Sequence, residues 1–262
     1  IGKIVIAGNT TMLHIILGED PLPLALAPFK PEFTEKQIRK GHESGLNINA
    51  EADVITLPCL AAFIGADIIT GLAVLKPLFR NYLFLDIGTN GEMALVKGGK
   101  IYTCATAAGP AFEGGGVDNG MRAALGAIER VDVDLLTAAP EYTTIGNAKP
   151  KGICGTGMIS LLANLLLTGW ITSSGKCNRD RQSGHIHYSG KQGYYVVAEA
   201  GETENGKTVR ISETDIGNII RAKAAIYSAC SLFLKHIGIT FNDVNNIYIA
   251  GGFGRYIDLS HA

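Results

Sequence analysis

An aspartate directly after an apolar run is the first feature of the sequence that could take part in chemistry. The run Tyr82–Leu85 has the composition of a buried strand, and Asp86 follows it. Its carboxylate could hold Mg²⁺ through water, because Mg²⁺ prefers oxygen ligands and keeps several waters. The residues that could face a phosphate are Gly88, Thr89, Asn90 and Gly91, since backbone N–H groups of a tight turn can converge on an anion. A plain hairpin that turns at Asn90-Gly91, with an exposed aspartate, explains these residues at least as well.

Two more glycine-containing segments could bind a nucleotide. One follows a late apolar run, at the strand end where ligands of α/β sheets tend to bind. The other begins a long apolar segment, whose helical N-terminus would favour an anion. The residues are Gly251, Gly252 and Phe253 in the first segment, and Gly155 and Thr156 in the second. Close helix–sheet packing also requires small residues, so both segments have a structural interpretation too.

A glutamate in a glycine-rich loop is the second candidate acid. Glu113 lies in residues 106–116, directly after an expected strand over residues 100–105. Its carboxylate could orient a water molecule or bind Mg²⁺. A solvated position in a loop accounts for a glutamate about as well.

Common catalytic and metal-binding motifs are missing from the sequence. It contains neither G-x-x-x-x-G-K-[ST] nor G-x-S-x-G. Its 5 cysteines include no C-x-x-C pair, which argues against a zinc ribbon or an iron–sulfur cluster and indicates reduced thiols in a cytoplasmic protein. His185 and His187, with Cys177 nearby, indicate an exposed hairpin more than a metal site. His14 is predicted to be a hydrogen-bonded core residue.

These residues are expected to be positioned by alternating strands and helices. Strands are predicted over residues 3–7, 54–57, 82–86, 92–96, 100–105, 128–133 and 246–250, with a hairpin of 194–199 and 208–211. Helices are predicted over 12–17, 60–76, 117–128 and 215–237, with a short helix near 35–40 and a terminal one after Gly254. Residues 152–157 are predicted to open another long helix that ends at about residue 167.

Composition limits the classes of protein that fit. The chain has 262 residues, of which 47% are hydrophobic and 18% charged, and its 33 glycines are about twice the usual share. These values exclude a disordered chain, a coiled coil and a collagen. A net charge of −1 gives no basic field, so no nucleic-acid partner is expected. The apolar stretches at 56–75 and 153–171 contain polar residues and are predicted to be core helices, with no membrane association.

The order of the motifs resembles that of a known superfamily. It is the superfamily of actin, sugar and acetate kinases and heat-shock chaperone ATPases, in which the D-x-G hairpin holds phosphates and the late Gly-Gly holds the nucleoside. A closer resemblance, over about residues 3 to 258, is to the C-terminal ATPase domain of the reductive activators of corrinoid proteins. The segments that carry it are residues 5–14, 85–92, 106–114, 152–155 and 249–254.

This resemblance implies a fold, cofactors and a partner. The fold would be α/β, a ribonuclease-H-like ATPase of two lobes with mixed sheets flanked by helices, and residues 1–262 would form one ATPase domain of two subdomains. ATP and Mg²⁺ would be bound, with Asp86 positioning Mg²⁺ through water and Glu113 as a second catalytic acid. The domain would drive the reduction of a corrinoid protein, or of a corrinoid-dependent methyltransferase, from Co(II) to Co(I) for methyl transfer. A homodimer is left open.

The sequence departs from the family pattern near its start. It begins with Ile1, lacks the cysteine spacing of a [2Fe–2S] cluster and the acidic phosphate loop that precedes residue 8 in the family, and has Cys59 where an asparagine is expected. We therefore expect a piece of a longer protein, with the [2Fe–2S] cluster in an upstream ferredoxin-like domain and one lobe incomplete. Two alternatives stay open: a kinase of a small carboxylate or sugar, and a partner-binding scaffold without nucleotide chemistry.

Overall fold

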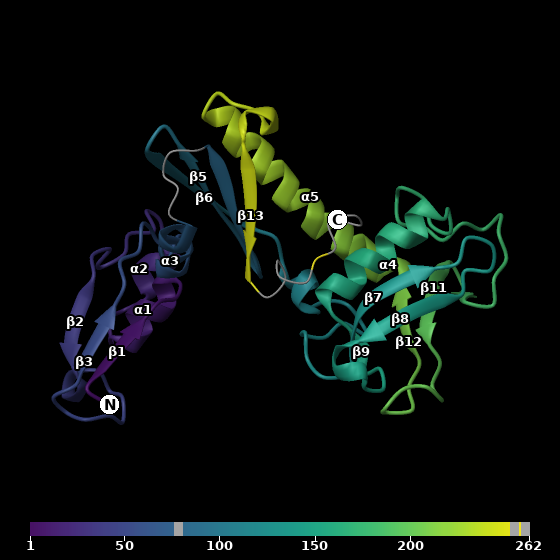
Figure 1. The fold of residues 1–262 in the computed structure, drawn as a ribbon, viewed down its shortest axis with the longest axis horizontal. Coiled ribbons are helices and arrows are strands. Elements are labelled where there is room, and N and C mark those ends of the chain that lie inside the picture. The colour runs from purple at the N-terminus through teal and green to yellow at the C-terminus, as the bar shows by residue number, and fades with distance from the viewer. Residues whose placement is uncertain (76–80, 252–256, 258–262) are drawn as a thin grey trace. The chain divides into compact units, whose positions relative to one another are not determined.

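The computed structural model describes residues 1–75, 81–251 and 257, which belong to two compact units (Figure 1). The first unit comprises residues 1–85, 92–105 and 233–248, and the second comprises 86–91, 106–232 and the residues from 249 onward. Both contain helices and sheets, so the predicted mixed α/β class is confirmed. The short 3₁₀ helices are Gly41–Glu43, Pro110–Glu113, Ile145–Asn147 and Phe241–Asp243.

The first unit contains a three-stranded mixed sheet in the order β1-β3-β2. β1 (Lys3–Ile6) is parallel to β3 (Asp53–Thr56), and β2 (Gln37–Lys40) is antiparallel to β3. The short helix predicted near residues 35–40 is wrong, because this segment is β2. Its pairing is fixed by Ile38 opposite Ile55 and by an ion pair of 2.9 Å between Lys40 Nζ and Asp53 Oδ1.

Three helices accompany this sheet. They are α1 (Thr10–Ile16), α2 (Leu22–Ala25) and α3 (Ala66–Leu75). Leu13 of α1 and Ala66 of α3 are buried in one apolar cluster with Cys59. α3 begins later than predicted, because Ala61 and Ile64 pair with each other in a tight turn before it. The last predicted residue, 76, lies outside the described residues.

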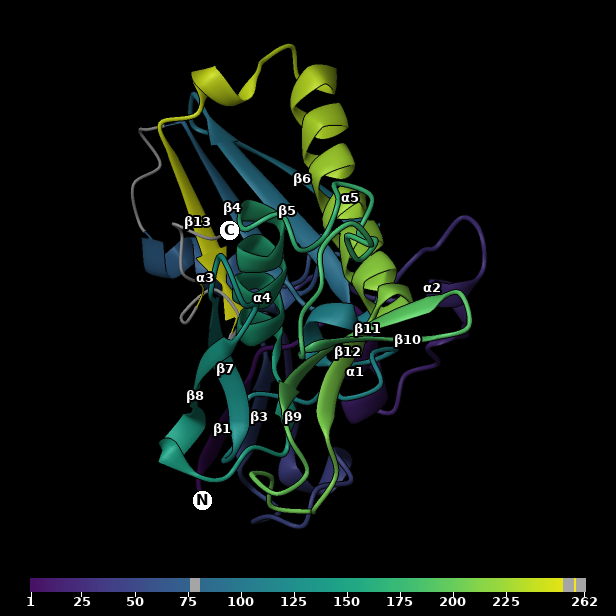
Figure 2. The same cartoon turned by 90° about the vertical axis from the view of Figure 1, so that its right-hand side faces the viewer.

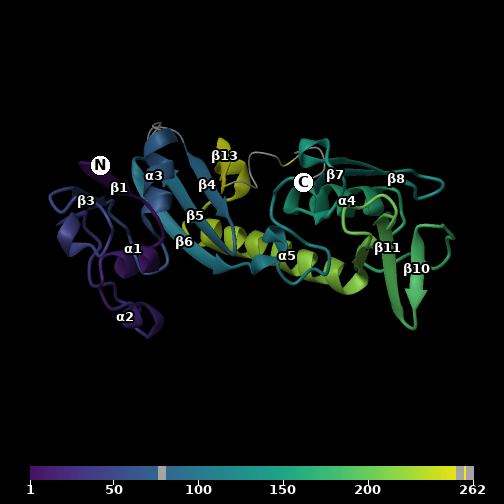
Figure 3. The ribbon, with the colours of Figure 1, turned by 90° about the horizontal axis from the view of Figure 1, so that it is seen from below.

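A four-stranded sheet has the order β13-β4-β5-β6. Its strands are β4 (Tyr82–Ile87), β5 (Asn90–Lys97), β6 (Lys100–Ala107) and β13 (Asn246–Ala250), and Figure 3 shows β4, β5 and β6 side by side. The predicted meander is confirmed, but its first turn lies at Gly88 and Thr89 instead of Asn90-Gly91. Gly91 is a buried strand residue, and a Cβ on it would lie 3.1 Å from Thr106 Cγ2.

The second unit contains a sheet with the order β8-β7-β9, against which α4 packs (Figure 2). The strands are β7 (Ala127–Val133), β8 (Pro140–Thr144) and β9 (Gly152–Ile153), and the helix is α4 (Gly155–Leu167), as predicted. A Cβ on Gly157 would lie 2.2 Å from Ile128 O, so only glycine permits this approach. Ser160 Oγ accepts a hydrogen bond of 2.9 Å from Val131 N and fixes α4 on β7.

An antiparallel sheet, β10-β11-β12, leads into the longest helix. The strands are β10 (Ile186–Ser189), β11 (Gln192–Ala198) and β12 (Val209–Ser212), and the helix is α5 (Glu213–His236). The predicted hairpin and helix are both confirmed.

Within the described residues, no helix is both long enough and apolar enough to cross a membrane. The predicted helix after Gly254 lies outside these residues.

The helix predicted over residues 117–128 is wrong. Residues 117–126 form an irregular loop, and β7 begins at Ala127. Gly120 pairs with Ile153 in an isolated parallel bridge, and Gly116 and Gly126 have φ of +71° and +83°. Glycines disfavour a helix, and here the loop backbone pairs with β9 instead.

Candidate nucleotide site

Asp86 lies near the end of the apolar strand β4, and Thr89 lies in the turn that joins β4 to β5. Tyr82, Leu83 and Phe84 are buried, whereas Asp86 is partly exposed and Thr89 is exposed. Gly88 N donates to Asn90 O at 3.0 Å, and Gly109 N donates to Thr89 O at 3.0 Å. The turn is therefore held by its backbone, and the Thr89 and Asn90 side chains remain at the surface.

Glu113 lies against this turn. It ends the 3₁₀ helix Pro110–Glu113, between Gly109 and Gly114, whose φ values are +83° and +86°. The Thr89 hydroxyl donates a hydrogen bond to Oε2 of Glu113. A Cβ on Gly88 would lie 3.7 Å from Oε1 of the same carboxylate. The two motifs that the sequence places 24 residues apart thus meet at one carboxylate.

A cavity of about 190 Å³ lies beside Glu113 in the second unit. Its wall includes two predicted residues of α4, Gly155 and Thr156, together with Glu113. The full lining is Ile87, Phe112, Glu113, Arg122, Ala123, Glu129, Ile145, Cys154, Gly155 and Thr156. The end of β4, the Glu113 loop and the start of α4 therefore share one cavity.

The N-terminus of α4 forms part of this wall. Cys154 is the N-cap residue and its side chain makes no capping hydrogen bond. Its Sγ lies 3.3 Å from both Ile128 O and Thr156 Oγ1, and both Cys154 and Thr156 are buried. First-turn N–H groups without a side-chain cap favour an anion, since the helix dipole places partial positive charge there.

The end of β13 lies beside Asp86. Gly251 has φ of +83°, and a Cβ on it would lie 3.1 Å from Asp86 Oδ1 and 3.7 Å from Ile87 O. This close approach, together with the positive φ, explains why glycine occupies the position. The other two predicted residues of the segment, Gly252 and Phe253, lie outside the described residues.

The structure brings together some predicted residues and separates others. Thr89 joins Glu113, Gly251 joins Asp86, and Glu113 shares the cavity with Gly155 and Thr156. The other described residues predicted for the site do not line the cavity: Asp86, Gly88, Thr89, Asn90, Gly91 and Gly251. Gly91 is buried between Thr106 and Ile226.

Two charged residues of the cavity were not identified from the sequence. Arg122 lies in the segment that was assigned to a helix, and Glu129 lies in β7 among apolar neighbours. Gly120 and Gly126, on either side of Arg122, are the signal that could have indicated an irregular loop there.

The oxygen donors near the turn suit Mg²⁺. Asp86 and Thr89 lie at the turn, and Glu113, Glu129 and Thr156 line the adjoining cavity. Within the described part of the chain, no three His, Cys, Asp or Glu side chains are close enough to hold a metal ion. Such a donor set fits a cation that keeps most of its waters and binds phosphate oxygens. It does not fit an iron–sulfur cluster, which needs several thiolates.

The first turn of α5 holds the loop that follows Glu113. Asp215 Oδ2 accepts hydrogen bonds from Ser212 N and Ser212 Oγ at 2.9 and 2.7 Å, and its Oδ1 accepts from Asp118 N at 3.2 Å. Asn218 Nδ2 donates to Gly116 O at 2.7 Å. The loop from Glu113 to Arg122 is thereby attached to a long helix.

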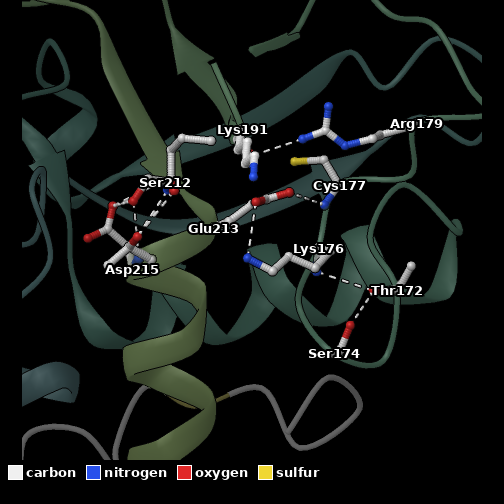
Figure 4. Close-up of polar contacts among 11 residues, drawn as sticks. Thr172, Ser174, Lys176, Cys177, Arg179, Lys191, Ser212, Glu213 and Asp215 are labelled. Atoms are coloured by element: carbon white, nitrogen blue, oxygen red, sulfur yellow. Dashed lines mark hydrogen bonds and ion pairs between the residues drawn. The ribbon is translucent and has the colours of Figure 1, made fainter. Parts of the chain in front are cut away.

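The buried carboxylate of Glu213, at the start of α5, holds the segment that contains Lys176 and Cys177. Figure 4 shows Glu213 between Lys176 and Cys177: Oε1 accepts from Cys177 N at 2.9 Å and Oε2 from Lys176 Nζ at 3.2 Å. Burial opposes ionisation, but hydrogen bonds from the Cys177 backbone, Lys176 and the Gly193 backbone outweigh it and lower the pKa of Glu213. Burial raises the pKa of the Cys177 thiol to about 11, so this thiol is unreactive at neutral pH.

Comparison with known proteins assigns a family to both parts of the chain. Residues 80–262 match the model described as the C-terminal domain of RACo, the ASKHA domain, and residues 1–76 match the RACo middle region. A "Corrinoid activation enzyme RamQ" of Eubacterium limosum is 37% identical over 98% of this chain and 44% of its own length. A "[Co(II) methylated amine-specific corrinoid protein] reductase" of Methanosarcina barkeri is 28% identical over 81% of this chain and 40% of its own length.

A solved structure supports the same assignment. It is a "Reductive activator for corrinoid,iron-sulfur protein", 40% identical, with a TM-score of 0.92 over 99% of this chain and 42% of its own chain. The chain thus spans less than half the length of the relatives that it matches. By its sequence and its fold, the chain belongs to the RACo family of corrinoid activators, with an ASKHA domain, a nucleotide-binding type of fold, over residues 80–262.

Proposed function

We propose that this chain binds Mg-ATP and hydrolyses it slowly, as the ATPase part of a protein that reduces a corrinoid protein from Co(II) to Co(I). The observation that carries the proposal is the shared cavity, at which the end of the D-x-G-T strand, Glu113 and the N-terminus of α4 meet. The family supports it, since its members are named for corrinoid activation.

Each predicted residue has a role in this proposal. Asp86 holds Mg²⁺ through water, and Glu113, whose carboxylate is fixed by Thr89, orients the attacking water. The phosphates are assigned to backbone N–H groups of the turn other than that of Gly88, which donates to Asn90 O, and to those of the first turn of α4. The residues assigned to phosphate are Gly88, Thr89, Asn90, Gly91, Gly155 and Thr156, and those assigned to the nucleoside are Gly251, Gly252 and Phe253.

ATP has a physical purpose in this reaction. Co(I) in a corrinoid is a very strong reductant, so its formation from an ordinary iron–sulfur donor is uphill. A nucleotide can supply the difference only by binding one conformation or complex better than another. We assign the electrons to a [2Fe–2S] cluster in another part of the full protein, and the acceptor to a corrinoid protein or corrinoid-dependent methyltransferase.

Two further assignments belong to this proposal. All five cysteines are free thiols, which persist in the reducing cytoplasm, and we place the protein there. We also propose a homodimer, whose test is the mass of the full-length protein in solution by light scattering. The assignment of residues 1–262 to one ATPase domain stays a prediction.

Calorimetric titration with Mg-ATP tests the function. The titration compares residues 1–262 alone with the full-length protein, and each with its Asp86→Asn variant. We expect the full-length protein to bind Mg-ATP and the variant to bind it at least about tenfold more weakly, since it loses a carboxylate near Mg²⁺. Absence of nucleotide binding in both wild-type proteins would contradict the proposal and favour a scaffold. Phosphorylation of a small carboxylate or sugar would favour a kinase.

A further inference from the structure

The cavity carries a pair of acids and one opposing charge. Glu113 and Glu129 are its acidic residues, and Arg122 is the one cationic residue among those that line it. The wall alone therefore has a formal charge of −1, which would repel a phosphate. A bound Mg²⁺ would offset this charge, and the Arg122 guanidinium is the one side chain of the wall that itself attracts an anion.

The backbone next to Arg122 is hydrogen-bonded to β9, the strand that precedes α4. The residue before it, Met121, donates its backbone N–H to Ile153 O at 2.9 Å, and Ile153 N donates to Asn119 O at 2.8 Å. A Cβ on Gly114 would lie 2.4 Å from Met121 N, so the Glu113 loop also packs directly on this backbone. The backbone at Arg122 is thereby fixed beside both Glu113 and the start of α4.

The size of the cavity limits what part of a nucleotide it can hold. Sites for whole small molecules usually enclose about 300–1,000 Å³. The cavity here measures about 190 Å³, which suits a phosphate group with a metal ion and not a nucleoside triphosphate.

The position of the cavity indicates which end of the nucleotide it would take. Gly251, beside Asp86, belongs to the segment assigned to the nucleoside, and it is not among the lining residues. Ile87, which precedes the turn, and Glu113, which accepts a hydrogen bond from Thr89, are among them, whereas residues 88–91 of the turn are not. The cavity therefore adjoins the turn assigned to the phosphates.

We propose that the Arg122 guanidinium contacts the terminal phosphate of Mg-ATP and makes this site prefer ATP to ADP. An arginine suits this role because its planar fork can donate two parallel hydrogen bonds to a phosphate, which a lysine cannot. The inference rests on the proposed nucleotide function and adds to it a residue that determines specificity.

The test is calorimetric titration of the full-length protein with Mg-ATP and with Mg-ADP. The variants are Arg122→Gln and Arg122→Lys, with Arg130→Gln as the matched control. Arg130 loses the same charge, but its Nε pairs with Asp132 Oδ2 at 2.9 Å and it does not line the cavity. We expect Arg122→Gln to weaken Mg-ATP binding about tenfold or more and Mg-ADP binding less than about threefold, since only ATP loses a charged hydrogen bond.

The outcomes separate this inference from the function on which it rests. Arg122→Lys should lie between wild type and Arg122→Gln, and Arg130→Gln should keep the wild-type ratio of ATP to ADP affinity. If the wild-type protein binds neither nucleotide, the proposed function fails first. If wild type binds Mg-ATP and Arg122→Gln keeps the wild-type ratio, or loses both affinities equally, the inference about Arg122 is overturned while the function stands. Thermal unfolding of each variant shows whether a loss comes from misfolding.

Discussion

Two turns of the molecule use the same residue types for different purposes. Residues 8–11, Gly-Asn-Thr-Thr, follow β1, and residues 88–91, Gly-Thr-Asn-Gly, follow β4. In the first turn, Asn9 Oδ1 accepts from Met12 N at 2.9 Å, and the fully buried Thr10 hydroxyl donates to Ala61 O at 2.6 Å. In the second turn, Thr89 and Asn90 are exposed, and the Thr89 hydroxyl donates to the exposed carboxylate of Glu113.

The difference shows how a polar turn becomes available for binding. Side chains of the first turn hydrogen-bond to backbone groups of the first unit, so these hydrogen bonds stabilise the fold. The second turn is held by backbone hydrogen bonds, and its Thr89 and Asn90 side chains are exposed to solvent, where a ligand can reach them. The same residue types thus indicate a site only when their side chains remain exposed instead of being buried against the backbone of the fold.

Asp86→Asn should produce the largest effect on Mg-ATP hydrolysis and so test whether the second turn, unlike the first, serves binding. We expect Mg-ATP hydrolysis to fall about a hundredfold to a thousandfold, because the charge that positions Mg²⁺ disappears. We expect a much smaller effect on thermal unfolding, since Asp86 is partly exposed. Hydrolysis rates of the full-length protein, with melting temperatures alongside, check both expectations. Unchanged turnover would reject the role of Asp86.

Glu213→Ala should produce the largest effect on stability. Glu213 is a carboxylate whose oxygens are used internally, and its removal leaves the buried N–H of Cys177 without an acceptor. We expect a loss of about 3 kcal/mol in the free energy of unfolding. Glu204→Ala is the matched control, because Glu204 also pairs with a lysine, at 3.0 Å from Lys151 Nζ, but is exposed. That variant should lose less than about 1 kcal/mol.

The pH dependence of the same site gives an independent check. The pKa of Glu213 is lower in the folded protein than its ordinary value of 4.5, so the ionised carboxylate stabilises the fold above that pH. This contribution is lost as the pH falls through the lowered pKa. Urea unfolding at a series of pH values should show a gap between wild type and Glu213→Gln at pH 7 that narrows below pH 4.5. A gap that stays constant down to pH 3 would show that the charge of Glu213 is not what stabilises the fold.

Much of the fold was predictable because its elements are local. The meander of β4, β5 and β6, the helix α4 and the helix α5 follow from apolar periodicity and from glycines at their ends. His14 was correctly predicted as a core residue: it is fully buried, and its two nitrogens lie 2.8 Å from Thr10 O and 3.1 Å from Glu32 N.

The errors arose where tertiary pairing outweighs local preference. The segment 117–126 has alanines and a leucine near its end, but its backbone pairs with Ile153. Arg122 lies in this loop and reaches the cavity from it. The hydrogen bond between Thr89 and Glu113 could not be predicted from the sequence, since spacing along the chain does not determine which loops meet.

Thr10→Val tests the first turn. Valine has nearly the same shape as threonine but cannot donate to Ala61 O, so we expect a loss of about 1–2 kcal/mol in the free energy of unfolding. We expect no change in Mg-ATP affinity once the variant is folded. Urea unfolding and calorimetry of the same samples measure the two quantities. A specific loss of nucleotide affinity in a folded variant would mean that the two turns do not differ as proposed.

Thr89→Val makes the same substitution in the second turn and should have the smallest effect. The Thr89 hydroxyl is exposed, and its bond to Glu113 competes with water, so the free energy of unfolding should change by less than about 0.5 kcal/mol. The Glu113 carboxylate loses one of its positioning contacts, which should lower kcat for Mg-ATP hydrolysis about threefold at a similar KM. Thr89→Ser keeps the hydroxyl and should restore the rate. If Thr89→Val costs as much stability as Thr10→Val, or if serine fails to restore kcat, the second turn is a structural element like the first.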